Sequence, residues 1–127
     1  MARLADIMTR DVFTTAPDVP VADVARSMVK GRVGSALVMR GSMLVGIFTE
    51  RDVLRAAASG KDLTTSRVAD WMTSDPETVD ADVDSEDAAE LMLSRGFRHL
   101  PIVEGNECVG IVSLRDVLSV RIGRGAR

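Results

Sequence analysis

Apolar residues recur at helical spacing in two stretches of the chain. From Val21 to Val29 they fall three and four positions apart, which places them on one face of a helix. Ser85 to Leu93 has the same spacing, and the acidic residues around its start favour the positive end of a helix dipole. The pattern therefore predicts two amphipathic helices.

Short apolar, β-branched runs follow each of these helices. Ser35 to Met39 and Met43 to Phe48 flank a glycine-containing turn, which is the signature of a hairpin. Leu100 to Val103 and Glu107 to Val112 repeat the arrangement around a second glycine. Each predicted helix is thus followed by a two-stranded hairpin.

Weaker signals complete the pattern. Arg3 to Thr9 and Arg67 to Thr73 predict short helical lead-ins, and Val12 to Thr15 predicts a brief strand that ends before a proline. Thr49 and Ser113 each open a further helix directly after a hairpin. Together these signals predict the order strand, helix, hairpin, helix in each half of the chain.

The halves resemble one another because the chain is a tandem repeat. The stretch GIFTERDVL, Gly46 to Leu54, returns as GIVSLRDVL, Gly110 to Leu118, 64 residues later. At that offset, 20 positions between Arg3 and Leu54 are identical in both copies, and no gap is needed. A repeat of this length indicates two copies of one structural unit.

The repeat sets the expected domain boundaries. We expect a first unit at residues 1–60, a linker at 61–66, a second unit at 67–120 and a basic, disordered tail at 121–127. The predicted fold class is α/β (α+β), with two β-α-β-β-α units packed sheet to sheet about a pseudo-two-fold axis. Each half is near the size at which a core becomes marginal, so the halves should fold against one another.

The composition of the chain narrows the range of functions that it could have. The 127 residues carry a formal net charge of −3, which weighs against sequence-independent nucleic-acid binding. No stretch is long and apolar enough for a signal peptide or a membrane span, so the cytoplasm is the expected location. The single cysteine, Cys108, permits no internal disulfide and is expected to be a buried, inert thiol. With one His and one Cys, no zinc site of the His/Cys kind is expected.

A hydroxyl and an acid stand three residues apart at the start of each closing helix. These are Thr49 with Asp52 and Ser113 with Asp116. The spacing fits a helix capping box, with Asp in place of the usual Glu. A helix N-terminus also offers free backbone N–H groups to a ligand, and a nearby carboxylate can accept hydrogen bonds from a ribose diol. Both roles can hold together if the hydroxyl caps the helix and the carboxylate stays partly free.

These motifs resemble a known family. The duplicated G-I-x-[TS]-x-R-D-V-L pattern, the G-F-R-H-L-P-I-V segment and the A-D-x-M-T lead-ins are similar to those of the cystathionine-β-synthase (CBS) domain, and two in tandem resemble a Bateman module. The resemblance extends from Arg3 to about Val120. It implies a stand-alone regulatory module, not an enzyme, that binds an adenosine-containing ligand such as AMP, ADP or ATP in clefts between the copies. It also implies a homodimer that signals to a partner protein.

The resemblance assigns a role to each motif residue. It implies ribose binding by Asp52 and Asp116, with Thr49, Arg51, Ser113 and Arg115 beside the ribose or phosphate. It implies that Thr14, Thr15, Thr78 and Val79 wall the base, and that Arg98 and His99 reach the phosphates. The first copy has Gly34 and Ser35 where the second has Arg98 and His99, so the two clefts should differ chemically.

Several alternatives stay open at this point. Arg95, Arg98, Arg115 and the basic tail could bind nucleic acid instead, or the clefts of a purely structural dimer could stay empty. Trp71 is expected either to pack in the core or to serve a subunit interface. Whether Mg²⁺ accompanies the ligand is left open, and the sequence indicates no catalytic cofactor and no metal ligands.

Overall fold

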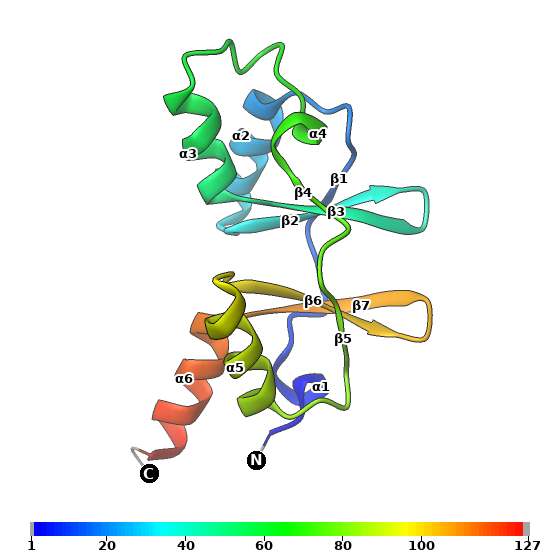
Figure 1. Ribbon diagram of the computed structural model, residues 1–127, viewed down its shortest axis with the longest axis vertical. Helices are drawn as coiled ribbons and strands as arrows, with labels where there is room; N and C mark the ends of the chain where they lie inside the picture. The colour runs from blue at the N-terminus through cyan, green and yellow to red at the C-terminus, as the bar shows by residue number, and fades with distance from the viewer. Residues whose placement is uncertain (1, 126–127) are drawn as a thin grey trace. The chain divides into compact units, whose positions relative to one another are not determined.

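The computed structural model describes residues 2–125 as two compact units (Figure 1). One unit is Phe13–Pro76, which we call the central unit. The other combines Met1–Val12 with Glu77–Arg127, and we call it the terminal unit. The compact units therefore differ from the continuous division at 1–60 and 67–120, because the first residues of the chain pack with the second copy.

The central unit is a small sheet with its helices on one face (Figure 1). Its elements are β1 (Thr14–Thr15), α2 (Val21–Gly31), β2 (Ser35–Arg40), β3 (Met43–Thr49), α3 (Glu50–Ala58), α4 (Val68–Trp71) and β4 (Thr73–Ser74). The strand order is β1-β2-β3-β4; β1 runs parallel to β2, and the other neighbours are antiparallel. The predicted helix and hairpin are confirmed, whereas β4 was not predicted.

The terminal unit repeats this plan. Its elements are α1 (Leu4–Ile7), β5 (Val79–Asp80), α5 (Ser85–Arg95), β6 (His99–Glu104), β7 (Glu107–Ser113) and α6 (Leu114–Gly125). The strand order is β5-β6-β7, with β5 parallel to β6 and the hairpin antiparallel. A bridge between Thr9 and Ile111 takes the place that β4 holds in the central unit. The α/β fold class is therefore confirmed.

Each lead-in is hydrogen-bonded to the copy that is not its own. The N–H of Leu4 donates to the carbonyl of Val83 at 2.9 Å, although Leu4 belongs to the first copy. In the central unit the N–H of Val68, from the second copy, donates to the carbonyl of Val19 at 2.9 Å. Leu4 and Val68 are both fully buried in the cores they join. The exchange therefore completes both hydrophobic cores.

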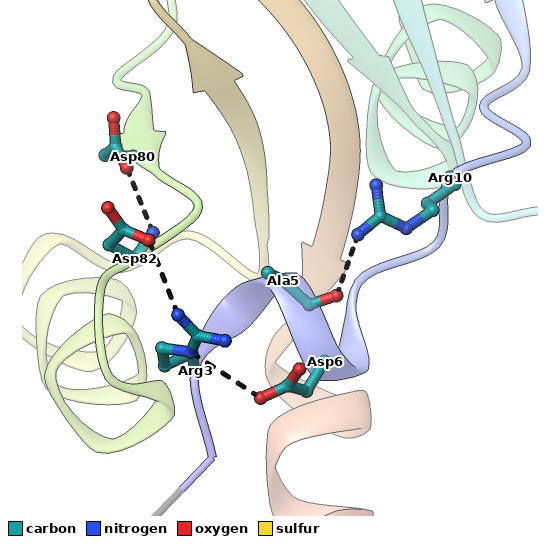
Figure 2. Close-up of polar contacts among 6 residues, drawn as sticks. All are labelled: Arg3, Ala5, Asp6, Arg10, Asp80 and Asp82. Carbon is teal, nitrogen blue, oxygen red and sulfur yellow. Dashed lines mark hydrogen bonds and ion pairs between the residues drawn. The ribbon is translucent and has the colours of Figure 1, made fainter.

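A charged side chain of the N-terminal lead-in also contacts the second copy, since Arg3 lies near Asp82. Figure 2 shows the Arg3 guanidinium between the carboxylates of Asp6 and Asp82, each 3.8 Å away. Arg10 donates to the carbonyl of Ala5 at 3.2 Å. Because the Arg3 pairs are exposed, each contributes less than about 1 kcal/mol. The apolar contacts of the lead-in, rather than its charges, are therefore the main source of its attachment.

Two repeat-related glycines make room for the exchanged lead-ins. A Cβ added to Gly110 would lie 2.7 Å from the Met8 sulfur and 2.9 Å from the Thr9 carbonyl oxygen. A Cβ added to Gly46 would lie 2.5 Å from the Met72 sulfur. Real Cβ atoms do not approach other atoms so closely, so Met8 and Met72 can pack this tightly against the sheets only because glycines stand at positions 110 and 46.

The C-terminal segment differs from its prediction. Residues 121–127 were expected to form a disordered tail, but α6 continues to Gly125. The helix meets no proline in this segment, and isolated glycines cost only about 1 kcal/mol each inside a helix. Residues 126–127 lie outside the described part of the chain.

Candidate functional site

The predicted ligand residues gather at one end of each sheet. In the central unit Thr49, the last residue of β3, pairs with Ser35 at the start of β2, and Thr14 of β1 pairs with Leu37 on the other side of β2. Because neighbouring strands lie about 4.8 Å apart and Ser35 and Leu37 are two residues apart along β2, the backbones of Thr14 and Thr49 lie about 12 Å apart. This separation suits the two ends of a nucleoside.

The terminal unit brings the corresponding residues together. Ser113 at the end of β7 pairs with His99 at the start of β6, and Val79 of β5 pairs with Ile102. The N–H of Leu114 donates to the carbonyl of Arg98 at 2.8 Å, so α6 begins beside Arg98. The candidate ribose and phosphate residues thus lie together at one end of the sheet, whereas Val79 lies on the other side of β6, three residues farther along the strand.

We use the term strand–helix junction for Thr49–Asp52 in the central unit and Ser113–Asp116 in the terminal unit. In the central unit Asp52 is only 6% exposed. Its Oδ2 accepts from the Thr49 N–H at 2.9 Å and the Thr49 hydroxyl at 3.3 Å, and its Oδ1 accepts from Arg55 at 2.9 Å. The expectation of a partly free carboxylate is therefore wrong for Asp52, because Arg55 occupies the second oxygen.

The junction of the terminal unit is more open. The Ser113 hydroxyl accepts from the Asp116 N–H at 3.0 Å, and Asp116 Oδ2 accepts a longer bond of 3.3 Å from the Ser113 N–H. Asp116 is half-buried, and within the described part of the chain its other oxygen accepts no hydrogen bond. Ser119 stands where the first copy has Arg55. Here the hydroxyl caps the helix and the carboxylate stays partly free, which is the arrangement in which capping and ligand binding can both hold.

The two edges also differ in charge. Arg98 is exposed and His99 half-buried at the start of β6, and Arg115 is exposed on α6. In the central unit Gly34 takes the place of Arg98, and the Glu50 carboxylate lies 3.5 Å from where a Gly34 Cβ would be. Because Arg51 is exposed at the position that repeats Arg115, the difference in charge comes from Arg98 in the terminal unit and from Glu50 in the central unit.

Sequence reasoning missed a cluster around Trp71. Arg55 lies 5.6 Å and Lys61 6.0 Å from the centre of the Trp71 ring, within the range of cation–π attraction. Trp71 also packs against the central core, as expected. The second copy offers no match, because Ile7 and Ser119 take the places of Trp71 and Arg55. These mismatches between the copies were the signal that could have revealed the cluster.

The remaining residues considered in the sequence analysis offer weaker evidence for a binding site. Arg95, a candidate for nucleic-acid contact, forms an ion pair with Glu77 at 3.2 Å. Cys108 is half-buried, and burial raises the pKa of its thiol. Among the described residues no group of three or more His, Cys, Asp or Glu could hold a metal ion. In the same part of the chain, every helix is too short or too polar to span a bilayer.

Comparison with known families gives a match in both copies. The model of the CBS domain matches residues 4–59 and 68–123. An uncharacterised 17.7 kDa protein of Acidianus ambivalens is 40% identical over 117 residues, which are 91% of this chain and 70% of that protein. The CBS domain-containing protein YhcV of Bacillus subtilis is 36% identical over 118 residues, 92% of this chain and 84% of its own length.

Solved structures share the fold. The CBS-domain containing protein ATU1752 of Agrobacterium tumefaciens superposes with a TM-score of 0.89 at 30% identity, covering 94% of this chain and 99% of its own. The CBS domain pair of protein MJ0100, solved with 5′-methylthioadenosine and S-adenosyl-L-methionine, also has a TM-score of 0.89, with 98% of both chains covered. Its identity is 21%, so it supports the fold alone.

Proposed function

Because this chain belongs to the CBS-domain family and carries two copies of the domain in tandem, we propose that it is a regulatory module that binds an adenosine-containing ligand. The observation that carries the proposal is the terminal strand–helix junction. There a half-buried, partly free Asp116 carboxylate lies at the same sheet edge as Arg98 and His99. The CBS domain pair of protein MJ0100, which shares the fold, was solved with 5′-methylthioadenosine and S-adenosyl-L-methionine, and adenosine-containing ligands are therefore the class to test on this chain.

Each residue has a defined role in the proposal. Asp116 accepts hydrogen bonds from the ribose hydroxyls, as acidic residues do in dinucleotide-binding folds. Ser113 and Arg115 lie beside the ribose, and Arg98 and His99 face the phosphates of AMP, ADP or ATP. Thr78 and Val79 wall the base. In the central unit the repeat-related positions are held by Asp52, Thr49, Arg51, Thr14 and Thr15, but there both Asp52 oxygens already accept hydrogen bonds.

The proposed output is a change of state rather than a reaction. A ligand that binds one conformation better than another shifts the population toward it by that difference in affinity. A partner protein that recognises the favoured conformation would then respond to the nucleotide. We propose no catalytic role for any residue, because the roles proposed for the candidate residues are to bind sugar, base and phosphate.

The module is proposed to act as a homodimer. Exposed leucines recur at repeat-related positions on the helices after each hairpin, Leu54 on α3 at 70% and Leu118 on α6 at 43%. Val29 on α2 and Leu93 on α5 form a second exposed pair. A second copy of the chain would remove these side chains from water, which favours association.

Thermal unfolding with a panel of ligands tests the proposal. AMP, ADP, ATP, NAD and S-adenosylmethionine are each added to the wild type, to Asp116→Asn and to Asp52→Asn. A ligand at 100 times its Kd adds about 2.7 kcal/mol to the apparent stability, so its midpoint rises by several degrees. We expect at least one adenine nucleotide to raise the wild-type midpoint and to have a much smaller effect on Asp116→Asn.

Two results would contradict this expectation. A midpoint that no ligand in the panel moves would favour a structural dimer. A shift of equal size in Asp116→Asn would show that the nucleotide binds elsewhere on the chain. Asp52→Asn serves as the matched variant, because the same substitution is made at the repeat-related position.

A further inference from the structure

The two repeat-related acids differ in how much of their hydrogen-bonding capacity is left for a ligand. Asp52 is 6% exposed, and the Thr49 N–H, the Thr49 hydroxyl and Arg55 together engage both of its oxygens. A carboxylate oxygen has two lone pairs, so Oδ1 could accept one further bond, but the Asp52 side chain is only 8% exposed and a ribose hydroxyl would have to reach the oxygen that already holds Arg55. Within the described residues, Asp116 has one oxygen that makes no such bond.

Arg55 is itself held in place. Its guanidinium carbon lies 5.6 Å from the centre of the Trp71 ring, and its Nη1 lies 2.9 Å from Asp52. Trp71 is anchored because it packs against the central core from the exchanged lead-in. The aromatic contact and the ion pair fix the guanidinium at two points, which lowers the entropy cost of keeping it on Asp52.

The phosphate end of the central edge is unfavourable as well. Glu50 lies beside Gly34, at the position where the terminal unit presents Arg98. A nucleotide phosphate placed there would meet a carboxylate instead of a guanidinium, and like charges at short range repel. The terminal unit has Leu114 in place of Glu50 and Ser119 in place of Arg55.

We propose that Arg55 closes the central strand–helix junction by occupying Asp52, with Glu50 excluding phosphates, so that each chain binds one adenine nucleotide, at the terminal junction. This inference rests on the proposed function and adds the number and place of the ligands. It makes Arg55 and Glu50 the residues that determine selectivity, and Trp71 a positioning residue that acts through Arg55.

Isothermal titration with ADP counts the sites directly. The wild type is expected to bind one ADP per chain, and Asp116→Asn is expected to bind none. The double variant Glu50→Leu with Arg55→Ser, which gives the first copy the residues of the second, is expected to bind two. Its added site should be at least tenfold weaker, since the first copy has no counterpart of Arg98 and His99. Arg40→Ser, which removes an exposed arginine from the end of β2, is the matched control and should still bind one.

The outcomes separate this inference from the proposed function. The closure by Arg55 is overturned if the wild type binds two ADP molecules. It is also overturned if the double variant binds only one while its circular dichroism spectrum shows that it is folded. Either result leaves the proposed function intact. No binding of ADP or of the other adenosyl ligands by the wild type overturns both. If the double variant does not fold, the number of ADP molecules bound by the wild type and by Asp116→Asn tests the inference. A single wild-type site lost in Asp116→Asn supports the inference, and a single site that survives it contradicts it.

Discussion

At the residue scale, the Cys108 thiol shows how burial changes reactivity. Its side chain is half-buried, and its Sγ donates to the Gly110 carbonyl at 3.7 Å. Burial raises the pKa of this thiol above its ordinary value, because a buried thiolate loses hydration. At any pH below that raised pKa, the native protein therefore holds a smaller thiolate fraction than an exposed cysteine would.

The raised pKa predicts slow alkylation. Because only the thiolate attacks, iodoacetamide at pH 8 should modify native Cys108 several-fold more slowly than the same chain unfolded in urea. The native rate should keep rising as the pH is increased past the ordinary cysteine pKa. Mass spectrometry of timed samples measures both rates. Equal rates in the native and unfolded chains would contradict a buried thiol of raised pKa.

The two strand–helix junctions show how much of a site can be predicted from a sequence motif. The spacing of Ser113 and Asp116 predicted a capped helix, and the structure has the cap together with a partly free acid. The identical spacing of Thr49 and Asp52 gave a different result, because Arg55 reaches back from the next turn. Which side chain a carboxylate meets depends on rotamers and packing, which the motif does not encode. Ligand binding by either acid stays a prediction.

At the element scale, the exchanged lead-ins depend on two glycines in the hairpins. Gly110→Ala would place a methyl group 2.9 Å from the backbone oxygen of Thr9, which cannot swing away as a side chain can. We expect a loss of about 1–3 kcal/mol in the free energy of unfolding, the usual cost of overpacking. Urea denaturation followed by circular dichroism measures it.

Gly31→Ala is the control for this experiment. A Cβ at Gly31 would meet no atom closer than 3.9 Å, and alanine favours the helix in which Gly31 lies. Its free energy of unfolding should stay equal to the wild type or rise slightly. If Gly110→Ala is as stable as the wild type, Met8 and Thr9 do not pack against β7.

Most helices and hairpins were predictable because their signals are local. The apolar period of Val21 to Val29 and the glycine turn between β2 and β3 each lie within a few residues. The exchange of lead-ins could not be predicted in this way. The two lead-ins are near-copies, so the sequence gives no reason for either to join one sheet over the other. The two-residue strand β4 forms because the end of the second lead-in pairs with β3 of the central unit.

At the scale of the whole molecule, the exposed leucines predict self-association. The double variant Leu54→Glu with Leu118→Glu places two charges where a second copy of the chain is proposed to pack. Sedimentation velocity should show a dimer for the wild type and a monomer for this variant, because burying an unpaired charge is costly. Asp11→Glu, an exposed substitution that keeps the charge, should remain dimeric. A monomeric wild type at micromolar concentration would contradict the homodimer.

The family assignment required the whole chain rather than any one motif. The two copies of the CBS domain matched at residues 4–59 and 68–123 agree with the repeat that the sequence shows. The three-dimensional units exchange their first segments, so the repeat boundaries and the compact units do not coincide. A continuous repeat in the sequence can therefore be discontinuous in space.

Amide chemical shifts of the ¹⁵N-labelled protein during an ADP titration test the central claim most directly. If the terminal strand–helix junction binds the nucleotide, the largest shifts should fall on Thr78, Arg98, His99 and residues 113–116. The amides of Gly34, Ser35 and residues 49–52 should move much less. Shifts confined to the central junction, or no shifts at saturating ADP, would contradict the account.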